Sequence, residues 1–531
     1  MAVIIAVVWL EMAALQVFGA GVSGNDESSH VLNGYLIWSY LTGPLGSNPM
    51  AYAQDFYVHY PKISIGHWPP LYYAVMSLFF FISPDSFAPL MAYHLVMTAL
   101  PALIVLFVLW RQIGPRWALA AGVVCALLPL SIDNAYYFML DQTIAALAMA
   151  GMVLWVGYCR TRRLWYVLGY ALVAVAAVMV KGNGWLMGLF PVFHIALARQ
   201  WRLLLEWRLY VAAVVAVALV IPWYALTYKI ASDGFNYQWG MAYFAEAFPR
   251  FAKYVIGGSG LVVVALAAVG AVLALANRLE PRLGLMGTAA VAMVGAAVLF
   301  HAVVPVAIVP RYVSAALPAM AVLAVYGSQW LADRALARLD GGRAGAATLA
   351  VVAAATVAMV LPGLLHLHRH PPKVDLEMDL AAQRIVAETP ASTIVIDAHP
   401  GGEGALAYEV AIRDTGRRHY VVRSSDLLAQ SNFMGSSYQL TVKTPDEVLA
   451  KVEGLAATWV VAASGTAVFP RFEHSLLIAQ ALALPQSPYE LVATFPHRNR
   501  QGSTRLYRLR EPRAPDVKAV RAVNYPEKAI H

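Results

Sequence analysis

Charged side chains of both signs stand at the ends of apolar segments in this chain. Asp26 and Glu27 follow the first apolar segment, and Asp141 opens a later one. Lys181 ends one apolar segment, and Arg311 precedes another. A carboxylate can take a proton from an attacking hydroxyl group, and a cation can stabilise the charge that develops on a leaving phosphate. These residue types therefore suit the transfer of a group from a phosphate ester to a hydroxyl group.

The composition indicates which kind of protein must position these side chains. Hydrophobic residues make up 60% of the chain and charged residues only 13%, whereas soluble domains have about 25% charged residues. The mean hydropathy of +0.60 and the 14 Trp and 27 Tyr residues are typical of many membrane spans with aromatic belts. The net charge of +8 comes with arginines in short loops, which orient spans, so a nucleic-acid partner is excluded. We expect a multi-pass membrane protein.

Eleven apolar segments come close to the length of about 20 residues that a span needs. Short loops on one side carry most of the arginines, for example Arg111, Arg160 and Arg278. Since such loops stay in the cytoplasm, the N-terminus lies inside, and Asp26, like the other charged positions above, lies outside. The predicted spans are residues 2–20, 87–110, 117–133, 141–158, 164–180, 184–199, 209–227, 255–277, 284–303, 311–331 and 345–365.

Two segments fall outside this pattern. Residues 69–82 are apolar but too few to cross, so we expect a short helix at the membrane surface or half inserted. Residues 371–531 have nearly balanced charges, and short β-rich runs alternate there with helical patterns. This alternation predicts a soluble α/β domain with a small sheet. We therefore assign residues 1–370 to a membrane domain and residues 371–531 to an extracytoplasmic domain without a catalytic motif.

Each charged position also has a structural interpretation. Asp26 and Asp141 both stand where an aspartate caps a helix. Lys181 could extend its amine to the membrane interface, and Arg311 could anchor its span at the headgroups. His366, His368 and His370 alternate at the end of the last span, a spacing more typical of interfacial polarity than of a metal site. The sequence identifies no cofactor with certainty, and the use of a divalent cation stays open.

Five short motifs follow one another along the chain. They are the acid pair Asp26-Glu27, the run His67-Trp68-Pro69-Pro70, the second acid Asp141, the turn Lys181-Gly182, and Arg311-Tyr312 with Pro318. Taken in order, they resemble the motifs of the GT-C glycosyltransferases, in the branch that contains protein O-mannosyltransferases and the lipid A aminoarabinose transferase. The similarity covers residues 1 to about 365. Family members often have an arginine shortly before the second acid, which is missing here in residues 138–140.

The resemblance implies a sugar donor linked to polyprenyl phosphate and inversion at the anomeric carbon. It implies a bacterial inner-membrane enzyme with an extracytoplasmic site and a lipid, glycan or protein acceptor. Its candidate catalytic residues are Asp26 as general base, Glu27 and Asp141; its donor-phosphate ligands are Lys181, Arg311, His67 and Tyr312; and its candidate acceptor or lipid contacts are Lys62, Arg250 and Lys253.

The main competing interpretation is a transporter or a lipid flippase. Such a protein is expected to have a repeated half and charged groups near the middle of its spans. The predicted spans show no repeat, and Glu11, His94 and His194 are nearly their only ionisable interior residues. A non-catalytic scaffold is a third alternative, and it would require neither Asp141 nor Lys181.

Overall fold

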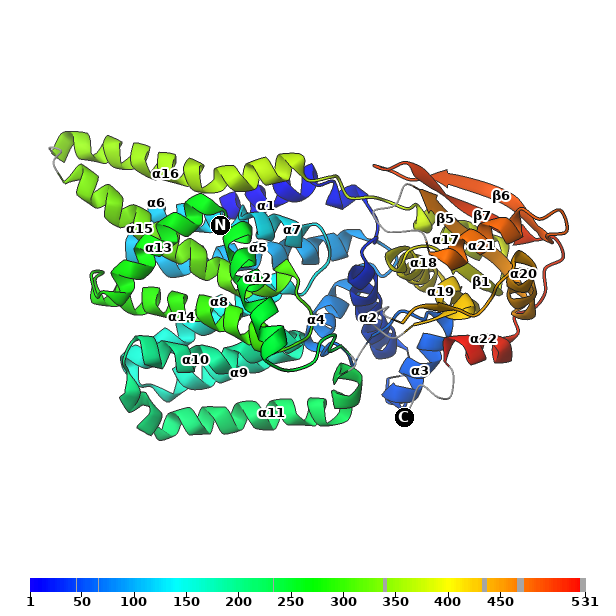
Figure 1. Cartoon of the computed structure of the whole chain (residues 1–531), viewed down its shortest axis with the longest axis horizontal. Helices are drawn as coiled ribbons and strands as arrows, with labels where there is room; N and C mark the ends of the chain where they lie inside the picture. Colours follow the sequence, from blue (N-terminus) through cyan, green and yellow to red (C-terminus); the bar gives the residue numbers. More distant parts are fainter. Residues whose placement is uncertain are drawn as a thin grey trace. The chain divides into compact units, whose positions relative to one another are not determined.

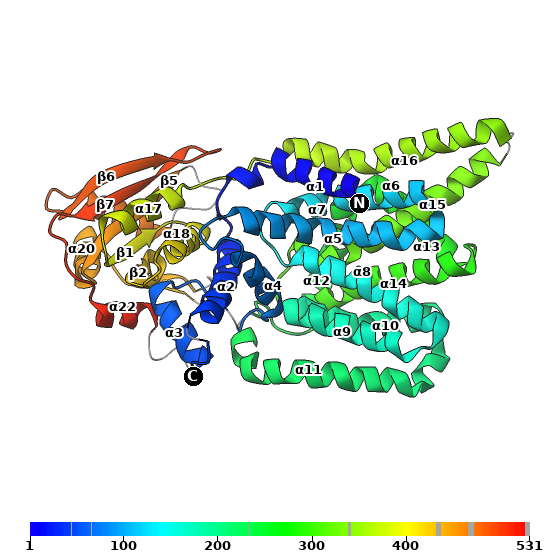
Figure 2. The same ribbon diagram turned by 180° about the vertical axis from the view of Figure 1, so that it is seen from behind.

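The computed structural model describes residues 1–43, 45–64, 66–232, 234–337, 341–431, 437–465 and 472–525, without the side chains of residues 282 and 341–345 (Figures 1 and 2). The chain packs into two compact units. We call the first the helical unit; it comprises Met1–Leu15, Gly66–Tyr72 and Ala92–Pro371. We call the second the α/β unit; it comprises Gln16–Ile65, Tyr73–Met91 and Pro372–His531. The predicted membrane and soluble domains stay predictions, because compact packing does not report which residues lie in a bilayer.

The helical unit is a multi-pass bundle, as predicted. Among the described residues, six helices are long and apolar enough to cross a membrane, or eight if each of two bent pairs counts as one span. Its helices are α1 (Ala2–Ala14), most of α5 (Ala88–Ile113), α6 (Pro115–Ala126), α7 (Pro129–Ala135), α8 (Asp141–Thr161), α9 (Leu164–Val180), α10 (Leu186–Leu197), α11 (Trp207–Ser232), α12 (Met241–Ser259), α13 (Leu261–Leu275), α14 (Pro281–Val303), α15 (Leu317–Leu336) and α16 (Gly341–Arg369), with the 3₁₀ segments η2 (Gly182–Trp185), η3 (Trp201–Leu205) and η4 (Pro310–Ala316).

Some of the predicted spans differ from the helices in the structure. The span predicted at 117–133 is bent by 59° between α6 and α7, where Pro129 starts the second helix at a position that needs no N–H group. The span predicted at 255–277 is divided at Gly260, whose φ of +81° ends α12 before a bend of 107°. Arg250 and Lys253, which precede this predicted span, lie within α12. The first helix ends at Ala14, short of the predicted residue 20.

The α/β unit contains the predicted sheet. Its five strands run in the order β2-β1-β5-β7-β6, with β1 parallel to β2 and β5, and β7 antiparallel to β5 and β6. Figure 1 shows β6 at the edge of this sheet. The strands are β1 (Ser392–Asp397), β2 (His419–Arg423), β5 (Ala457–Gly465), β6 (Tyr489–Pro496) and β7 (Gly502–Leu509), beside the short pair β3 (Ala429–Gln430) and β4 (Gln439–Leu440).

Helices from both ends of the sequence complete this unit. The first is α2, which begins next to the acid pair, and α3 follows it, so the segment between the first two predicted spans contains helices. All six residues of β1 are buried, and Val395, Val422 and Val460 share one hydrophobic core. The helices are α2 (Asn25–Thr42), α3 (Pro49–His59), α17 (Met378–Glu388), α18 (Pro400–Arg413), α19 (Ser424–Leu428), α20 (Pro445–Gly454), α21 (Glu473–Leu482) and α22 (Val517–Asn524), with the 3₁₀ turn η1 (Val17–Gly19).

The short helix predicted at residues 69–82 is present as α4 (Leu71–Phe80). Its ten residues rise about 15 Å at 1.5 Å per residue, roughly half the hydrocarbon thickness of a bilayer. This length is consistent with the prediction that the segment does not cross.

Candidate functional site

Two of the predicted site residues form a buried ion pair in the helical unit. Lys181 Nζ lies 2.7 Å from Asp141 Oδ1, and the two side chains are only 8% and 2% exposed. Asp141 opens α8, and Lys181 stands between the end of α9 and the 3₁₀ turn η2. Because water is largely excluded, the attraction between these charges is stronger than at a surface. Asp141 therefore fixes the position of the Lys181 ammonium group.

Close packing of the backbone holds Lys181 at this position. Its N–H donates to the carbonyl of Ala177 at 3.0 Å, and its own carbonyl accepts from the N–H of Gly184 at 2.8 Å. A Cβ atom on Gly184 would lie 2.2 Å from the carbonyl carbon of Ala177, which is backbone and cannot move aside. Only glycine fits this approach, so Gly184 lets the turn fold back on the end of α9.

The turn η4 brings an aromatic ring and a second cation to the same region. Lys181 Nζ lies 4.9 Å from the ring centroid of Tyr312, within the range of a cation–π contact. Arg311 Nη1 lies 3.9 Å from the sulfur of Met139, two residues before Asp141. The structure thus gathers Lys181, Arg311, Tyr312 and the start of α8, as expected for one site.

Polar contacts fix η4 in the bundle. The hydroxyl group of Ser314 donates to the carbonyl of Arg311, and Asn134 Nδ2 of α7 donates to Ser314 Oγ at 2.8 Å. The ring of His301 lies 5.1 Å from that of Tyr312. Contacts from α7 and α14 thereby hold the η4 backbone that carries Arg311 and Tyr312.

The two oxygens of Asp141 differ in their surroundings. Oδ1 accepts the hydrogen bond from Lys181, whereas Oδ2 is buried and has no hydrogen-bond partner within the described parts of the chain. With Arg311 nearby, the cluster contains two cations and one carboxylate. Asp141 Oδ2 is therefore the atom of this cluster that can accept a hydrogen bond from a ligand.

Glu27, the second residue of the acid pair, contacts the backbone at the start of α2 and a distant lysine. Its Oε2 accepts from the N–H groups of Ser23 and Gly24, both at 2.9 Å, which satisfies two backbone donors at the start of α2. Its Oε1 accepts from Lys373 Nζ at 2.5 Å, and both side chains are completely buried. Glu27 therefore joins α2 to residue 373, a pairing that no sequence pattern indicates.

Asp26 acts electrostatically on another predicted residue of the α/β unit, Lys62. Asp26 is the second residue of α2, next to Glu27, and its side chain is partly exposed. The pKa of Lys62 is lowered to about 8, mainly because burial penalises its charge and next because Arg423 is close. The carboxylates of Glu403 and Asp26 oppose this shift. Lys62 is therefore an amine that changes its charge near neutral pH in the neighbourhood of Asp26.

The remaining predicted residues lie in the helical unit. His67 precedes α4 and is partly buried. Arg250 and Lys253 are exposed on α12, and Arg250 pairs with Glu246 at 3.1 Å one turn away. An exposed pair of this kind contributes about 0–1 kcal/mol to stability, so these cations are available to lipids or ligands.

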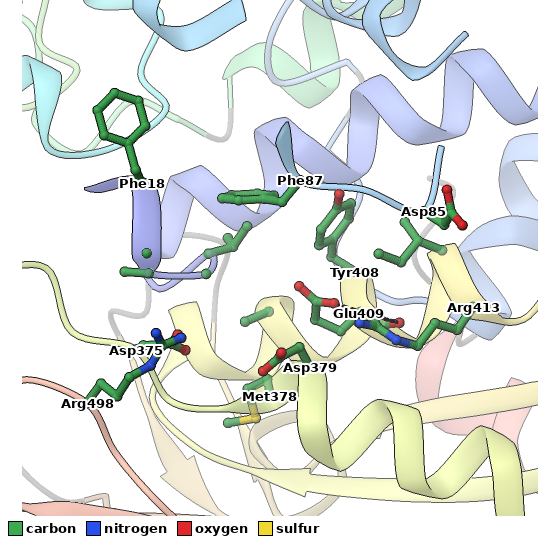
Figure 3. Close-up of a pocket in the computed structure, with 16 residues that line it drawn as sticks. Phe18, Asp85, Phe87, Asp375, Met378, Asp379, Tyr408, Glu409, Arg413 and Arg498 are labelled. Carbon is green, nitrogen blue, oxygen red and sulfur yellow. Dashed lines mark hydrogen bonds and ion pairs between the residues drawn. The ribbon is translucent and has the colours of Figure 1, made fainter. Parts of the chain in front are cut away.

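A cavity of about 210 Å³ in the α/β unit was not predicted (Figure 3). Phe18 and Phe87 border one side, and Asp375 and Asp379 lie on the opposite side. Four carboxylates and two arginines line the cavity, so its charge favours a hydroxylated or cationic group over a phosphate. The lining charged residues are Asp85, Asp375, Asp379, Glu409, Arg413 and Arg498.

The charges around this cavity are mostly paired. Arg413 pairs with Glu409 one helical turn away, and Arg498 pairs with Asp375 and, at 2.7 Å, with Glu377. Burial raises the pKa of Glu409 to about 7, against the opposing effect of Arg413. Arg498 lies more than 100 positions from both of its partners in the sequence. No local sequence pattern could therefore reveal these pairs.

Comparison with known proteins identifies the fold. No protein-family model matches the chain, and no curated protein matches it. The crystal structure of ArnT from Cupriavidus metallidurans bound to undecaprenyl phosphate matches with a TM-score of 0.62 and 16% identity, over 95% of this chain and 96% of ArnT. The apo structure of that protein matches with a TM-score of 0.60, also at 16% identity, over 95% and 98% of the two chains.

A third structure agrees with these two. The oligosaccharyltransferase AglB from Archaeoglobus fulgidus, in complex with an inhibitory peptide and a dolichol-phosphate, matches with a TM-score of 0.52 and 12% identity, over 87% of this chain and 69% of AglB. ArnT and AglB are both GT-C membrane glycosyltransferases, and ArnT is the lipid A aminoarabinose transferase. This chain has the GT-C fold. The resemblance predicted from five short motifs is confirmed at the level of the fold.

Proposed function

We propose that the protein is a glycosyltransferase that transfers a sugar from a polyprenyl-phosphate donor to an acceptor hydroxyl group, with inversion. The observation that carries the proposal is the similarity over nearly the whole chain to ArnT bound to undecaprenyl phosphate. The cluster of Lys181, Arg311 and Asp141 supports it, because two cations beside one carboxylate suit the phosphodiester of such a donor, which carries one negative charge. We place the reaction on the extracytoplasmic side of a bacterial inner membrane, following the arginine loops.

In this proposal the cations act on the donor. Transfer of the sugar leaves the lipid phosphate with additional negative charge, and Lys181 and Arg311 stabilise that charge. Tyr312 presents its ring to Lys181 and helps to hold the ammonium group in place. Asp141 acts by orienting Lys181, and its second oxygen is suited to a hydroxyl group of the donor sugar. His67 contributes a further donor contact.

Asp26 is our proposed general base. Within the acid pair, Glu27 is occupied by Ser23, Gly24 and Lys373, which favours a positioning role for Glu27 and leaves Asp26 as the better candidate for proton transfer. General bases of this kind contribute roughly a hundredfold to ten-thousandfold to rate. Lys62, Arg250 and Lys253 would contact the acceptor or lipid headgroups, and the acceptor itself would be a lipid, a glycan or a protein.

The test compares envelope glycans by mass spectrometry in cells with and without the protein. We expect one sugar residue to disappear when the gene is deleted and to return with the wild-type chain. Lys181→Ala and Asp26→Asn should not restore it at comparable expression. Asp55→Asn is the matched control, because Asp55 is an exposed acid that pairs with Arg417 at the surface. Unchanged glycans after deletion, under conditions in which the protein is made, would overturn the proposal.

A further inference from the structure

Two histidines at the end of α16 meet an aspartate of α7 in the helical unit. His366 Nε2 lies 2.6 Å from Asp133 Oδ1, and His370 Nε2 lies 3.5 Å from the same oxygen. The two imidazole rings are 5.6 Å apart between centroids, since they are four positions apart along the chain. One ligand atom from each residue lies within 4.8 Å of the others. His368, the middle residue of the sequence run, is not part of this group.

The distances suit a metal ion with short bonds. Zn²⁺ binds imidazole nitrogen and carboxylate oxygen at about 2.0–2.2 Å, so tetrahedral ligand atoms are separated by roughly 3.3 Å. The observed separations of 2.6 and 3.5 Å lie on either side of this value. A displacement of less than about 1 Å of the His366 side chain from Asp133 would admit the ion.

The second ring nitrogen of His370 is already oriented. Nδ1 lies 2.9 Å from the carbonyl oxygen of Pro371, so this nitrogen carries the proton and donates it. Its Nε2, 3.5 Å from Asp133 Oδ1, is then the nitrogen that faces the other two residues. A backbone acceptor on the second nitrogen is typical of metal-binding histidines. The ring of Tyr136, 4.6 Å away between centroids, packs against His370.

The group is also accessible from solvent. The side chain of Asp133 is 42% exposed and that of His366 is 37% exposed. Three protein ligands leave at least one coordination position, which a water molecule can fill. Two imidazoles with one carboxylate select a transition metal such as Zn²⁺ over Mg²⁺ or Ca²⁺, which prefer oxygen ligands.

We propose that Asp133, His366 and His370 form a binding site for a divalent transition metal of the Zn²⁺ type. The ion would fasten the end of α16 to α7, the helix that precedes the segment leading to Asp141. It touches none of the residues to which we assign donor binding or proton transfer. Its role is therefore to hold these two helices together, and the inference is independent of the proposed transferase activity.

Metal content of the purified full-length protein tests this site. The protein is loaded with Zn²⁺ in detergent, freed of loose metal by gel filtration, and measured by inductively coupled plasma mass spectrometry. We expect about one zinc per chain for the wild type and for His368→Ala, the matched control on the same helix end. His366→Ala and His370→Ala should each weaken Zn²⁺ binding at least about tenfold in a competition titration with a chelating dye, and Mg²⁺ should not displace the zinc.

Thermal unfolding separates metal binding from folding. Added Zn²⁺ should raise the Tm of the wild type and of His368→Ala, because a ligand that binds only the folded chain stabilises it. It should leave the Tm of His366→Gln unchanged, a variant that keeps a hydrogen-bonding group next to Asp133. Equal zinc retention in the wild type and in both alanine variants would overturn the proposal. So would a stable wild-type protein that retains no zinc, which would leave only an ion pair between Asp133 and the histidines.

Discussion

Two buried lysine–carboxylate pairs, one in each unit, have opposite surroundings. In the α/β unit, the Glu27 carboxylate accepts hydrogen bonds from Lys373 and from two backbone N–H groups. In the helical unit, one oxygen of Asp141 accepts from Lys181, and the other has no hydrogen-bond partner within the described residues. A saturated pair holds backbone segments together, whereas a pair with an open acceptor beside a second cation can still bind a ligand. Burial of an ion pair alone therefore does not identify a functional site.

The largest effect should come from breaking the saturated pair. Lys373→Ala leaves the completely buried carboxylate of Glu27 without its cation, which we expect to destabilise the protein by about 3–5 kcal/mol. Thermal unfolding in detergent measures the loss. Lys443→Ala, at an exposed lysine of the same unit, is the control and should change stability by less than about 0.5 kcal/mol. A Tm equal to that of the wild type would show that the pair does not hold α2 in place.

Breaking the open pair should instead affect donor use. Lys181→Ala and Arg311→Ala are each expected to weaken transition-state stabilisation by about 2–4 kcal/mol, the range for a lost charged partner. Arg311→Lys should recover only part of the rate, because a compact ammonium group cannot replace a planar guanidinium group. Rates against donor concentration measure these effects, and Arg250→Ala and Lys253→Ala, at exposed cations to which we assign acceptor or lipid contact, should change donor use less. Equal, small losses at all four positions would mean only general attraction to anionic lipid.

The acid pair itself allows the comparison to be sharpened. Asp26→Asn should lower turnover at least about a hundredfold, with little change in Tm. Glu27→Gln should mainly lower the Tm, because its contacts are the hydrogen bonds at the start of α2. Both quantities are measured on the same purified samples. A rate near that of the wild type in Asp26→Asn would exclude Asp26 as the base and make Asp141 the next candidate.

The smallest effect concerns pH. Because the pKa of Lys62 is lowered to about 8 from its usual 10.5, the folded chain loses this proton before the unfolded chain does. Between about pH 8 and pH 10.5 the unfolded state binds more protons, so stability should rise with pH in that window. We expect about 1 kcal/mol, reduced by partial solvent exposure, as the difference between wild type and Lys62→Met in denaturant titrations. Parallel pH profiles of the two proteins would contradict the shifted pKa.

Local patterns sufficed for the parts of the molecule that local forces determine. The apolar segments became helices, and runs such as 393–396 became strands, because period and burial are properties of neighbouring residues. Lys181 and Asp141 were expected on one face, since both stand at the same end of adjacent spans, and the structure pairs them. Their exact contact could not be predicted, because it depends on the close approach at Gly184.

Contacts between distant segments were beyond the reach of the sequence. Lys373 meets Glu27 across 346 positions, and Asp133 meets His366 across 233 positions. A single sequence contains no periodicity that links such residues. The bend at Gly260 was also missed, because the apolar segment continues through it and glycine is common in spans.

The bend of 107° between α12 and α13 has a geometric consequence for substrates that move within a membrane. If α13 follows the bilayer normal, α12 runs nearly in the membrane plane, and its 19 residues extend about 28 Å along it. One side of α12, formed by Tyr243, Ala247, Phe251 and Val255, is buried, and Phe248 and Ile256 on the other side are exposed. A long-chain lipid that diffuses laterally toward the bundle on this side would meet α12 lying across its path. It could then approach only past the ends of this helix.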